Sequence, residues 1–279
     1  MFRRVFDFFI FSSLYISMCA VLMVYQTSQF ILHVPVSFNL VAFVFFSTVC
    51  SYNFHWYLTP SSVKLSERIL WAQRYKGLHL VLYFIGLAGS IYFFFTIREH
   101  WMSLAFGAFV TFLYSAPKLP LPFFTDLKKI AIGKTIFLAF VWMYVTTALP
   151  IFVAGKSWQP DYFFFAAGRF FLIYAICIIF DYRDRDDDRH DGIRSMITYF
   201  NERGINILFF LSIMLFTIST LALLAYNYTV YAILILLIPG LITATLYGYA
   251  KKNFSDYLYY FVLDGLMMFS GLLMLILRI

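Results

Sequence analysis

The sequence predicts an all-α polytopic membrane protein with about nine transmembrane helices. Two observations predict this fold class. The 279 residues are 62% hydrophobic and only 13% charged, and their mean hydropathy is +0.81. The charged fraction is about half that of soluble proteins, so a water-soluble core of this size would leave too much apolar surface uncovered. The apolar residues also form long runs, and a helix needs about 20 such residues to cross a bilayer.

The apolar runs define the expected helices, at residues 5–32, 36–58, 78–97, 101–116, 130–153, 161–180, 204–226, 229–250 and 256–278. Transmembrane strands would alternate with a period of two residues, and these runs do not. The first run follows two arginines like a signal peptide, but it is too long and has no clear cleavage site, so we expect a retained helix. No soluble domain interrupts the pattern, and residues 1–279 are therefore expected to form one transmembrane domain.

The basic residues predict the orientation of these helices. With nine spans, most Lys and Arg residues fall on the side of the N-terminus, in the connections 59–77, 117–129, 181–203 and 251–255. The opposite side, or positions close to it, receives only Arg98, Lys156, Arg169 and Arg278. Positive charge marks cytoplasmic loops, so we expect a cytoplasmic N-terminus. The net charge of +7 then reflects topology, and membrane lipids rather than nucleic acid are the expected partners. The oligomeric state is left open.

One short stretch, "FDYRDRDDDRHDG" at 180–192, holds six of the chain's 14 acidic residues. Asp181, Asp184 and Asp188 have the i, i+3, i+7 spacing that places side chains on one helical face. Like charges one turn apart repel, and a divalent cation offsets that repulsion. Mg²⁺ typically takes one or two carboxylates together with substrate phosphate oxygens. The spacing therefore favours a metal–diphosphate site. The alternative is a solvated loop whose arginines, Arg183 among them, neutralise the acids at the surface.

The sequence around these acids resembles a known family. "DYRDRDDDRHDGIRS", residues 181–195, resembles the second aspartate-rich motif, D-x-x-D-x-x-x-D, of the UbiA-type intramembrane prenyltransferases. Asp181, Asp184 and Asp188 match its three acidic positions. Residues 113–150 resemble the family's connection between the fourth and fifth helices. The resemblance implies helices around a central cavity that opens to the cytoplasmic side, and, by analogy with the family, a bacterial inner membrane.

The same resemblance implies roles for individual residues. Asp181, Asp184 and Asp188 become the catalytic and Mg²⁺-binding residues. The expected substrate-binding residues are Asn53, Tyr114, Lys118, Lys128 and Arg194. The donor would be a polyprenyl diphosphate or a related lipid phosphate. The acceptor stays open, because the family includes enzymes for quinone precursors, haem, chlorophyll, lipids and polyprenyl-phosphate sugars.

The family's first motif, N-D-x-x-D-x-x-x-D, is degenerate in this chain. The corresponding stretch is "YNFHWYLTPS" at 52–61, where Asn53 is kept and the acidic positions fall on Phe54, Tyr57 and Ser61. Losing one electrostatic contact can cost about 10²–10³ in rate. Three explanations remain: one metal plus basic residues suffices, His55 supplies a ligand, or the protein binds a lipid phosphate without catalysis. Two functions are therefore carried forward, a Mg²⁺-dependent membrane prenyltransferase and a non-catalytic isoprenoid or lipid-phosphate carrier.

Asp264 is a further candidate, because an ionisable residue inside a membrane span is costly and often functional. The alternative for this residue is a hydrogen bond to a polar side chain of a neighbouring helix. Aromatic residues around the degenerate motif fit a cavity wall that shields a cation, or ordinary helix packing.

Overall fold

The computed structural model describes residues 2–59, 66–115, 134–190 and 196–278, and its regular structure within these ranges is helical throughout. The helices are α1 (Phe2–Phe11), α2 (Leu14–Gln26), α3 (Phe38–Tyr57), α4 (Glu67–Arg74), α5 (Lys76–Thr96), α6 (Trp101–Ser115), α8 (Lys134–Met143), α9 (Leu149–Val153), α10 (Pro160–His190), α11 (Met196–Tyr199), α12 (Glu202–Ala222), α13 (Val230–Ala250) and α14 (Asp264–Leu277). Three π-helical turns, η1 (Thr27–Ile31), η5 (Tyr144–Ala148) and η7 (Leu258–Leu263), continue α2, join α8 to α9 and precede α14.

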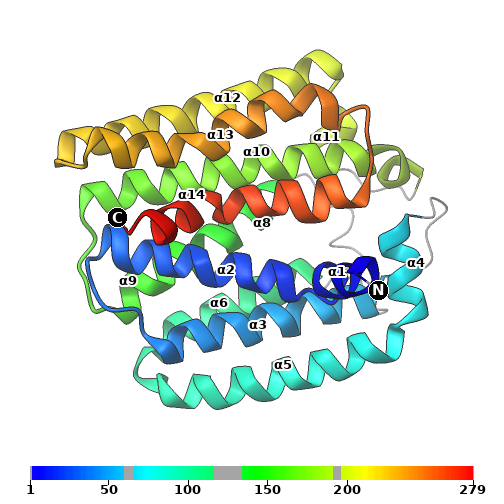
Figure 1. Cartoon of the computed structure of the whole chain (residues 1–279), viewed down its shortest axis with the longest axis horizontal. Coiled ribbons are helices and arrows are strands. Elements are labelled where there is room, and N and C mark those ends of the chain that lie inside the picture. Colours follow the sequence, from blue (N-terminus) through cyan, green and yellow to red (C-terminus); the bar gives the residue numbers. More distant parts are fainter. Residues whose placement is uncertain (1, 60–65, 116–133, 191–195, 279) are drawn as a thin grey trace.

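The long helices lie side by side in one bundle (Figure 1). α10 packs against α8 and α12, α3 packs against α5, and α14 packs against α2. α12 and α13 form one side of the bundle and α5 forms the opposite side. α10 is the longest described helix, with 31 residues, and its central residues are fully buried. The acidic stretch is therefore the end of the helix that runs through the middle of the protein.

Seven described helical segments are long and apolar enough to cross a membrane: Leu14–Ile31, Lys76–Thr96, Thr135–Val153, Pro160–Arg185, Glu202–Tyr226, Val230–Ala250 and Leu258–Leu277. The other two predicted spans are also helices, α3 and α6. α6 has only 15 residues, and α3 carries the polar Asn53 and His55 near its end. The all-α polytopic membrane fold is confirmed, whereas the count of nine spans stays a prediction.

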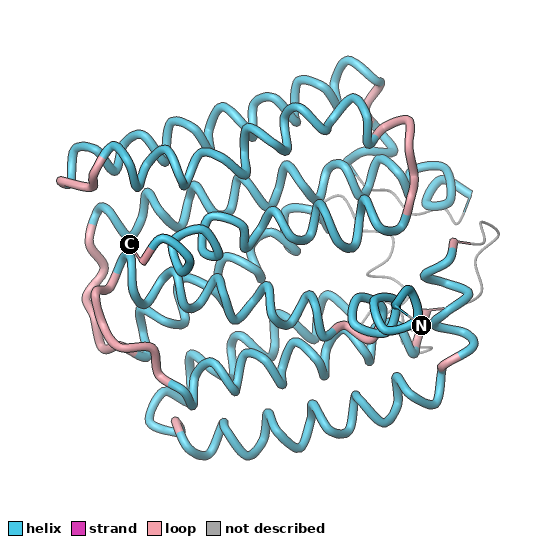
Figure 2. The backbone as a smooth tube through the Cα atoms, viewed as in Figure 1, coloured by secondary structure: helices cyan, strands magenta, loops and turns pink. Residues whose placement is uncertain are grey.

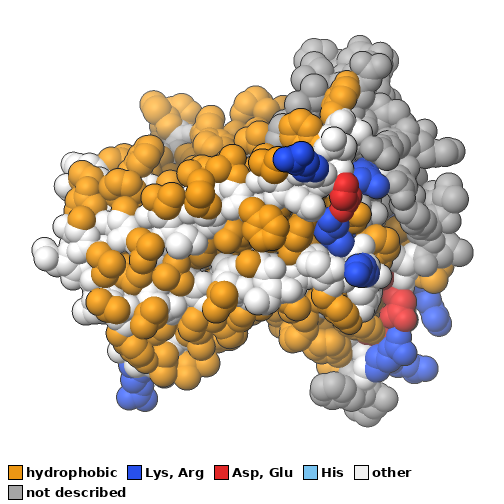
Figure 3. Space-filling view, turned by 90° about the horizontal axis from the view of Figure 1, so that it is seen from above, with side chains coloured by type: hydrophobic (Ala, Val, Ile, Leu, Met, Phe, Trp, Pro, Cys, Tyr) orange, Lys and Arg blue, Asp and Glu red, His pale blue; other side chains and the backbone are white. Residues whose placement is uncertain are grey.

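The outer surface has the character that a lipid environment requires. Large apolar side chains are exposed on the outward faces of the outer helices, including Val81, Phe84 and Ile85 of α5 and Leu234 and Leu241 of α13. Continuous apolar surface of this extent is rare on soluble monomers. Figure 3 shows apolar side chains along most of one face, with most of the visible charged side chains at one end. On this face, the exposed charges therefore lie where a membrane would end.

The connections that carry these charges lie at the same end of the bundle as the N-terminus. α3 ends there, α4 and α11 lie there, and the segment between α13 and η7 is also there (Figures 1 and 2). The described connections 32–37, 154–159 and 227–229 lie at the other end. This grouping agrees with the alternation inferred from the sequence. We call this end, with residues 181–190, α4 and the start of η7, the charged end.

The first predicted helix, residues 5–32, is wrong as one continuous element. It breaks between α1 and α2, where Ser13 has a left-handed backbone with φ 70°. Serine side chains compete for backbone hydrogen bonds and favour helix termini over interiors. The Ser13 carbonyl accepts a hydrogen bond from the Ser17 hydroxyl at 2.8 Å, and the Ser12 carbonyl accepts one from Asn53 of α3. The break therefore supplies a carbonyl that fixes the end of α3.

The charge pattern placed Arg169 at or near the side opposite the N-terminus, whereas the structure places it inside the bundle. It is 7% exposed inside α10, and its guanidinium donates hydrogen bonds to Gln26 Oε1, Thr27 Oγ1, Thr146 O and Thr147 Oγ1 at 2.6–2.9 Å. One acceptor, the Thr146 carbonyl, lies in π-helical turn η5, where the irregular backbone offers a group that an α-helix would use internally. Arg169 is therefore a buried packing residue and not a topology signal.

Candidate functional site

The acidic stretch ends α10 at the charged end. α10 continues without a break to His190, so its register places residues 181, 184 and 188 on one helical face, as the spacing predicted. Asp181 is 8% exposed and accepts a hydrogen bond from the Thr135 hydroxyl at the start of α8. The Asp184 side chain is 44% exposed. Only the backbone of Asp188 is described. One described carboxylate is thus fixed inside the bundle and the next one lies at its mouth.

Arg183 joins this acidic end to the last span. Its Nε lies 2.9 Å from Asp184 Oδ1, and its Nη2 donates to the Tyr260 hydroxyl at 2.9 Å. Its Nη1 lies 3.6 Å from Oδ1 of Asp256, the residue just before η7. The Arg183 side chain is only 13% exposed. The sequence suggested that arginines neutralise the acids at the surface, and the structure shows Arg183 doing so from inside the bundle. Arg185 pairs instead with Glu202, at 3.7 Å.

Asn53 lies near the end of α3 and is completely buried. Its amide Nδ2 donates to Ser12 O at 3.1 Å and to Val49 O at 2.8 Å, and its Oδ1 lies 2.6 Å from His79 Nδ1 of α5. Both amide hydrogens are therefore used within the protein, and the oxygen already accepts one hydrogen bond. The structure gives Asn53 a role in holding α3 against α2 and α5, and its contact with a substrate stays a prediction.

Other residues near the end of α3 make aromatic contacts with the neighbouring helices. Tyr52 packs edge-to-face on Trp142 of α8, with ring centroids 6.2 Å apart. His55 stacks on Tyr114 of α6 at 5.4 Å. Trp56 packs edge-to-face on Tyr260 at 5.9 Å, so α3 meets the last span directly. These contacts form an aromatic wall next to the acidic end of α10. Tyr114, predicted to bind substrate, is part of this wall.

Phe54 lies on another side of α3. Its ring lies 5.4 Å from that of Tyr83 of α5. α5 lies on the outer side of α3, away from α10 (Figure 1). A carboxylate at position 54 would therefore point away from Asp181. This placement gives a physical reason for the apolar residue, because it packs against a neighbouring helix.

A second buried arginine lies beneath the end of α3. Arg68 of α4 is 2% exposed, and its Cζ lies 3.9 Å from the centre of the Trp56 ring. Its Nη1 donates to the Phe11 carbonyl, and its backbone N–H donates to Asp256 Oδ2 at 2.8 Å. Burial lowers the pKa of Arg68 to about 9, which still leaves the guanidinium charged at neutral pH. The charged end therefore holds a buried cation whose guanidinium makes no ion pair with an acid among the described residues.

Two acids, Asp256 just before the last span and Asp264 within it, lie near these arginines. Burial raises the pKa of Asp256, and the Arg68 N–H and the Arg183 charge oppose that shift. Asp264 begins α14 and lies within Coulombic range of Arg183 and Arg68. Among the described residues its carboxylate makes no hydrogen bond, and its functional role stays a prediction. The sequence pattern did not indicate Asp256, whose partners come from α4 and α10.

Three of the predicted site residues, Lys118, Lys128 and Arg194, lie outside the described residues. The predicted connection 59–77 contains the short helix α4, whose buried positions are Arg68 and Ala72, whereas Leu70 is exposed. The Arg68 guanidinium is covered by aromatic rings rather than paired with an acid among the described residues.

The model of one protein family, described as the UbiA prenyltransferase family, matches residues 66–269, which is more than half of the chain. The chain belongs to the UbiA prenyltransferase family. No curated protein and no solved structure matches it significantly. The UbiA match extends from α4 into the first part of α14 and includes the acidic end of α10. It begins after the degenerate stretch 52–61, so the matched residues include the second acidic motif and not the first.

The UbiA family implies Mg²⁺, and the described carboxylates fit that ion in their chemistry. Asp181 and Asp184 are oxygen donors one helical turn apart, and Mg²⁺ usually takes one or two carboxylates with waters and phosphate oxygens. Asp184 Oδ2 makes no hydrogen bond among the described residues, and its side chain is accessible. The described residues contain no cluster of three or more His, Cys, Asp or Glu, so they offer no site built from protein ligands alone. Substrate oxygens would have to complete the coordination.

Proposed function

We propose that this protein is a membrane prenyltransferase that transfers a polyprenyl group from its diphosphate, with Mg²⁺, to an acceptor not yet identified. The observation that carries the proposal is the position of Asp181 and Asp184. They end a helix through the centre of an apolar bundle, one turn apart, beside an aromatic wall. A bound Mg²⁺ would supply positive charge to the leaving diphosphate. The charged end would face the cytoplasm of a bacterial inner membrane.

The residues of the chain have distinct tasks in this proposal. Asp184 and Asp181, with Asp188 on the same face, hold the metal. Thr135 fixes Asp181 by donating a hydrogen bond to its carboxylate. The wall built on Tyr52 and Trp56 excludes water and stabilises a developing allylic cation through its ring faces. Tyr114, Lys118, Lys128 and Arg194 stay the proposed contacts to the substrate.

A second function, a non-catalytic carrier of an isoprenoid or lipid phosphate, is favoured by one specific observation. Asp184 is already paired with Arg183 at 2.9 Å. The degenerate first motif also supplies no carboxylate at Phe54 or Tyr57. A site with so few carboxylates holds fewer metal ions. With less positive charge to stabilise the leaving diphosphate, the protein would bind the phosphate without ionising the substrate.

Ligand-induced stabilisation of the full chain tests the proposal. We expect geranylgeranyl diphosphate with Mg²⁺ to raise the melting temperature in detergent by about 5 °C at saturating ligand, because a ligand that binds only the folded state stabilises it. Chelator and Asp184→Ala should each abolish most of the shift. Glu99→Ala is the matched control, because Glu99 is an exposed acid at the opposite end of the bundle.

The outcomes separate the two functions. A Mg²⁺-dependent shift together with prenylated product, across a panel of phenolic and lipid acceptors, supports the transferase. The same shift without product or diphosphate release supports the carrier. Equal shifts with Mg²⁺, with chelator and in the Asp184→Ala variant would overturn the metal site in both.

A further inference from the structure

A pocket among the described residues lies at the charged end, where the family's first acidic motif would stand. It has a volume of about 380 Å³ and is lined by Trp56, Tyr57, Thr59, Ile69, Ala72, Gln73 and Lys76. Binding pockets for small molecules begin at about 300 Å³, so this one has room for more than water. It belongs to the corner between α3, α4 and α5, and does not include Asp181 or Asp184.

The lining contains no acid. Tyr57 takes one of the acidic positions of the first motif, and the Nζ of Lys76 lies 4.9 Å from the centre of the Tyr57 ring. A site where relatives have a carboxylate for a metal therefore has an ammonium group in this chain. A cation at this position opposes the binding of a second metal ion and favours an anion.

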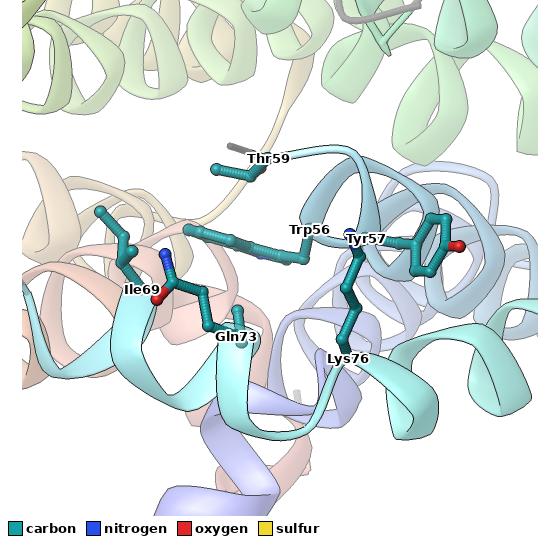
Figure 4. Close-up of a pocket in the computed structure, with 7 residues that line it drawn as sticks. Trp56, Tyr57, Thr59, Ile69, Gln73 and Lys76 are labelled. Carbon is teal, nitrogen blue, oxygen red and sulfur yellow. The ribbon is translucent and has the colours of Figure 1, made fainter. Parts of the chain in front are cut away.

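Two polar side chains of the pocket lining have N–H groups that donate no hydrogen bond among the described residues. Figure 4 shows Gln73 and Lys76 extending toward Trp56 from the corner of α4 and α5, with Thr59 on the other side of the indole. Among the described residues the Gln73 amide makes no hydrogen bond, and Lys76 makes no ion pair. Thr59 donates its hydroxyl hydrogen to His55 O at 2.8 Å. Gln73 and Lys76 together offer up to five N–H hydrogens to a ligand.

The buried guanidinium of Arg68 adds positive electrostatic potential near this pocket. The Arg68 guanidinium lies 3.9 Å from the centre of the Trp56 ring, and Trp56 is part of the pocket wall. A wall residue thus contacts a fixed positive charge, and the lining adds a second one at Lys76. Arg68 is buried and its charge is therefore screened less than a surface charge, whereas Lys76 is exposed. Two charges of one sign beside a concave lining attract the opposite ion. The ligand class that fits is a phosphate group.

We propose that this pocket binds a phosphate group through Lys76 and Gln73, without a metal ion, in place of the second metal that the first acidic motif would hold. The inference rests on the proposed function in that a diphosphate is one source of the phosphate. The other source is a lipid headgroup, because Lys76 begins the membrane span Lys76–Thr96 and therefore lies at headgroup depth. Trp56 links the pocket to the acidic end through Tyr260 and Arg183.

The test is calorimetric titration of the full chain in detergent with inorganic pyrophosphate, in the presence of chelator. We expect saturable binding that weakens about tenfold in Lys76→Gln, because one charge-assisted hydrogen bond is lost. Gln73→Glu should weaken it more, since it adds a negative charge to the lining. Arg74→Gln is the matched control: it makes the same charge change two residues from Lys76, but Arg74 lies outside the pocket lining. It should change the Kd less than twofold.

Binding measurements with different ligands and variants distinguish this inference from the proposed function. Lys76-dependent binding of pyrophosphate with no binding of geranylgeranyl diphosphate supports the pocket and overturns the isoprenoid donor. Pyrophosphate binding in chelator that Lys76→Gln and Gln73→Glu leave unchanged, or no such binding in detergent or in nanodiscs with phosphatidic acid, overturns the pocket alone. Equal losses in Lys76→Gln and Arg74→Gln also overturn it, because general charge would explain them. Lys76-dependent binding that appears only in nanodiscs with phosphatidic acid, and not with phosphatidylcholine alone, identifies the lipid source.

Discussion

The Nε of Arg183 lies 2.9 Å from Oδ1 of Asp184, so an acid of the second motif is already neutralised by its neighbour in the chain. The same guanidinium lies 3.6 Å from Asp256. The Arg183 guanidinium therefore links the acidic end of α10 to the last span. A cation fixed to the chain costs no binding entropy, but it competes with Mg²⁺ for Asp184.

Arg183→Gln should therefore increase the response of the protein to Mg²⁺. We expect a loss of stability of about 1–3 kcal/mol, less than for a fully buried pair because Asp184 is 44% exposed. We also expect a larger rise in melting temperature on adding Mg²⁺ than in wild type, because Asp184 and Asp256 are left without their cation. Arg185→Gln is the control, since Arg185 pairs with Glu202. A loss of stability with an unchanged Mg²⁺ response would show that Arg183 acts only in packing.

Asp256 should give the protein a measurable pH dependence. Burial raises its pKa above the ordinary value of 3.8, so the folded state binds more protons than the unfolded state in the range just above pH 3.8. The contribution of Asp256 to stability is therefore largest at low pH and is lost as pH rises through the folded pKa. We expect the melting temperature of wild type, relative to Asp256→Asn, to fall as pH rises through that range. Parallel curves for the two proteins would contradict the raised pKa.

The packing of α3 on α5 depends on Gly86. A Cβ at this position would lie 2.5 Å from the backbone nitrogen of Cys50, a contact that backbone atoms cannot relieve without moving a helix. Close helix approach at small residues is a common feature of membrane packing. We expect Gly86→Ala to lower stability by about 1–3 kcal/mol. Gly248→Ala is the control, because nothing lies within 4 Å of its Cβ and alanine favours the helix. Melting temperatures in detergent measure both.

Labelling of single cysteines tests the proposed orientation. Lys252→Cys lies at the charged end and Lys156→Cys at the opposite end, and both side chains are exposed. We expect a membrane-impermeant thiol reagent to modify position 156 from outside intact cells, and position 252 only after the membrane is opened. The wild-type cysteines are buried or half-buried, so wild type serves as the background control. Labelling of position 252 alone from outside would reverse the orientation, and labelling of both would contradict the bundle topology.

Much of the fold could be predicted from the sequence because it follows from local composition. Long apolar runs and few charges determined an all-helical membrane protein, and the ends of the runs lie close to the observed ends of most helices. The serine break in the first run was missed, because its left-handed residue depends on packing against Asn53 as well as on local preference. The spacing of Asp181, Asp184 and Asp188 also determined their shared face, since a continuous helix requires only the register of its own backbone.

The partners of these residues were decided by the tertiary structure alone. Arg183 is adjacent to Asp184 in the sequence, yet only the last span, 77 residues further at Tyr260, turns that pair into a link across the bundle. Arg68 is one arginine among several in a basic segment, and only the rings of Phe11, Trp56, Trp71 and Tyr260 make it a buried cation. Composition and periodicity report the environment that a residue prefers. Helix packing decides which distant residue supplies that environment. The acidic helix end could therefore be predicted from the sequence, whereas the cations around it could not.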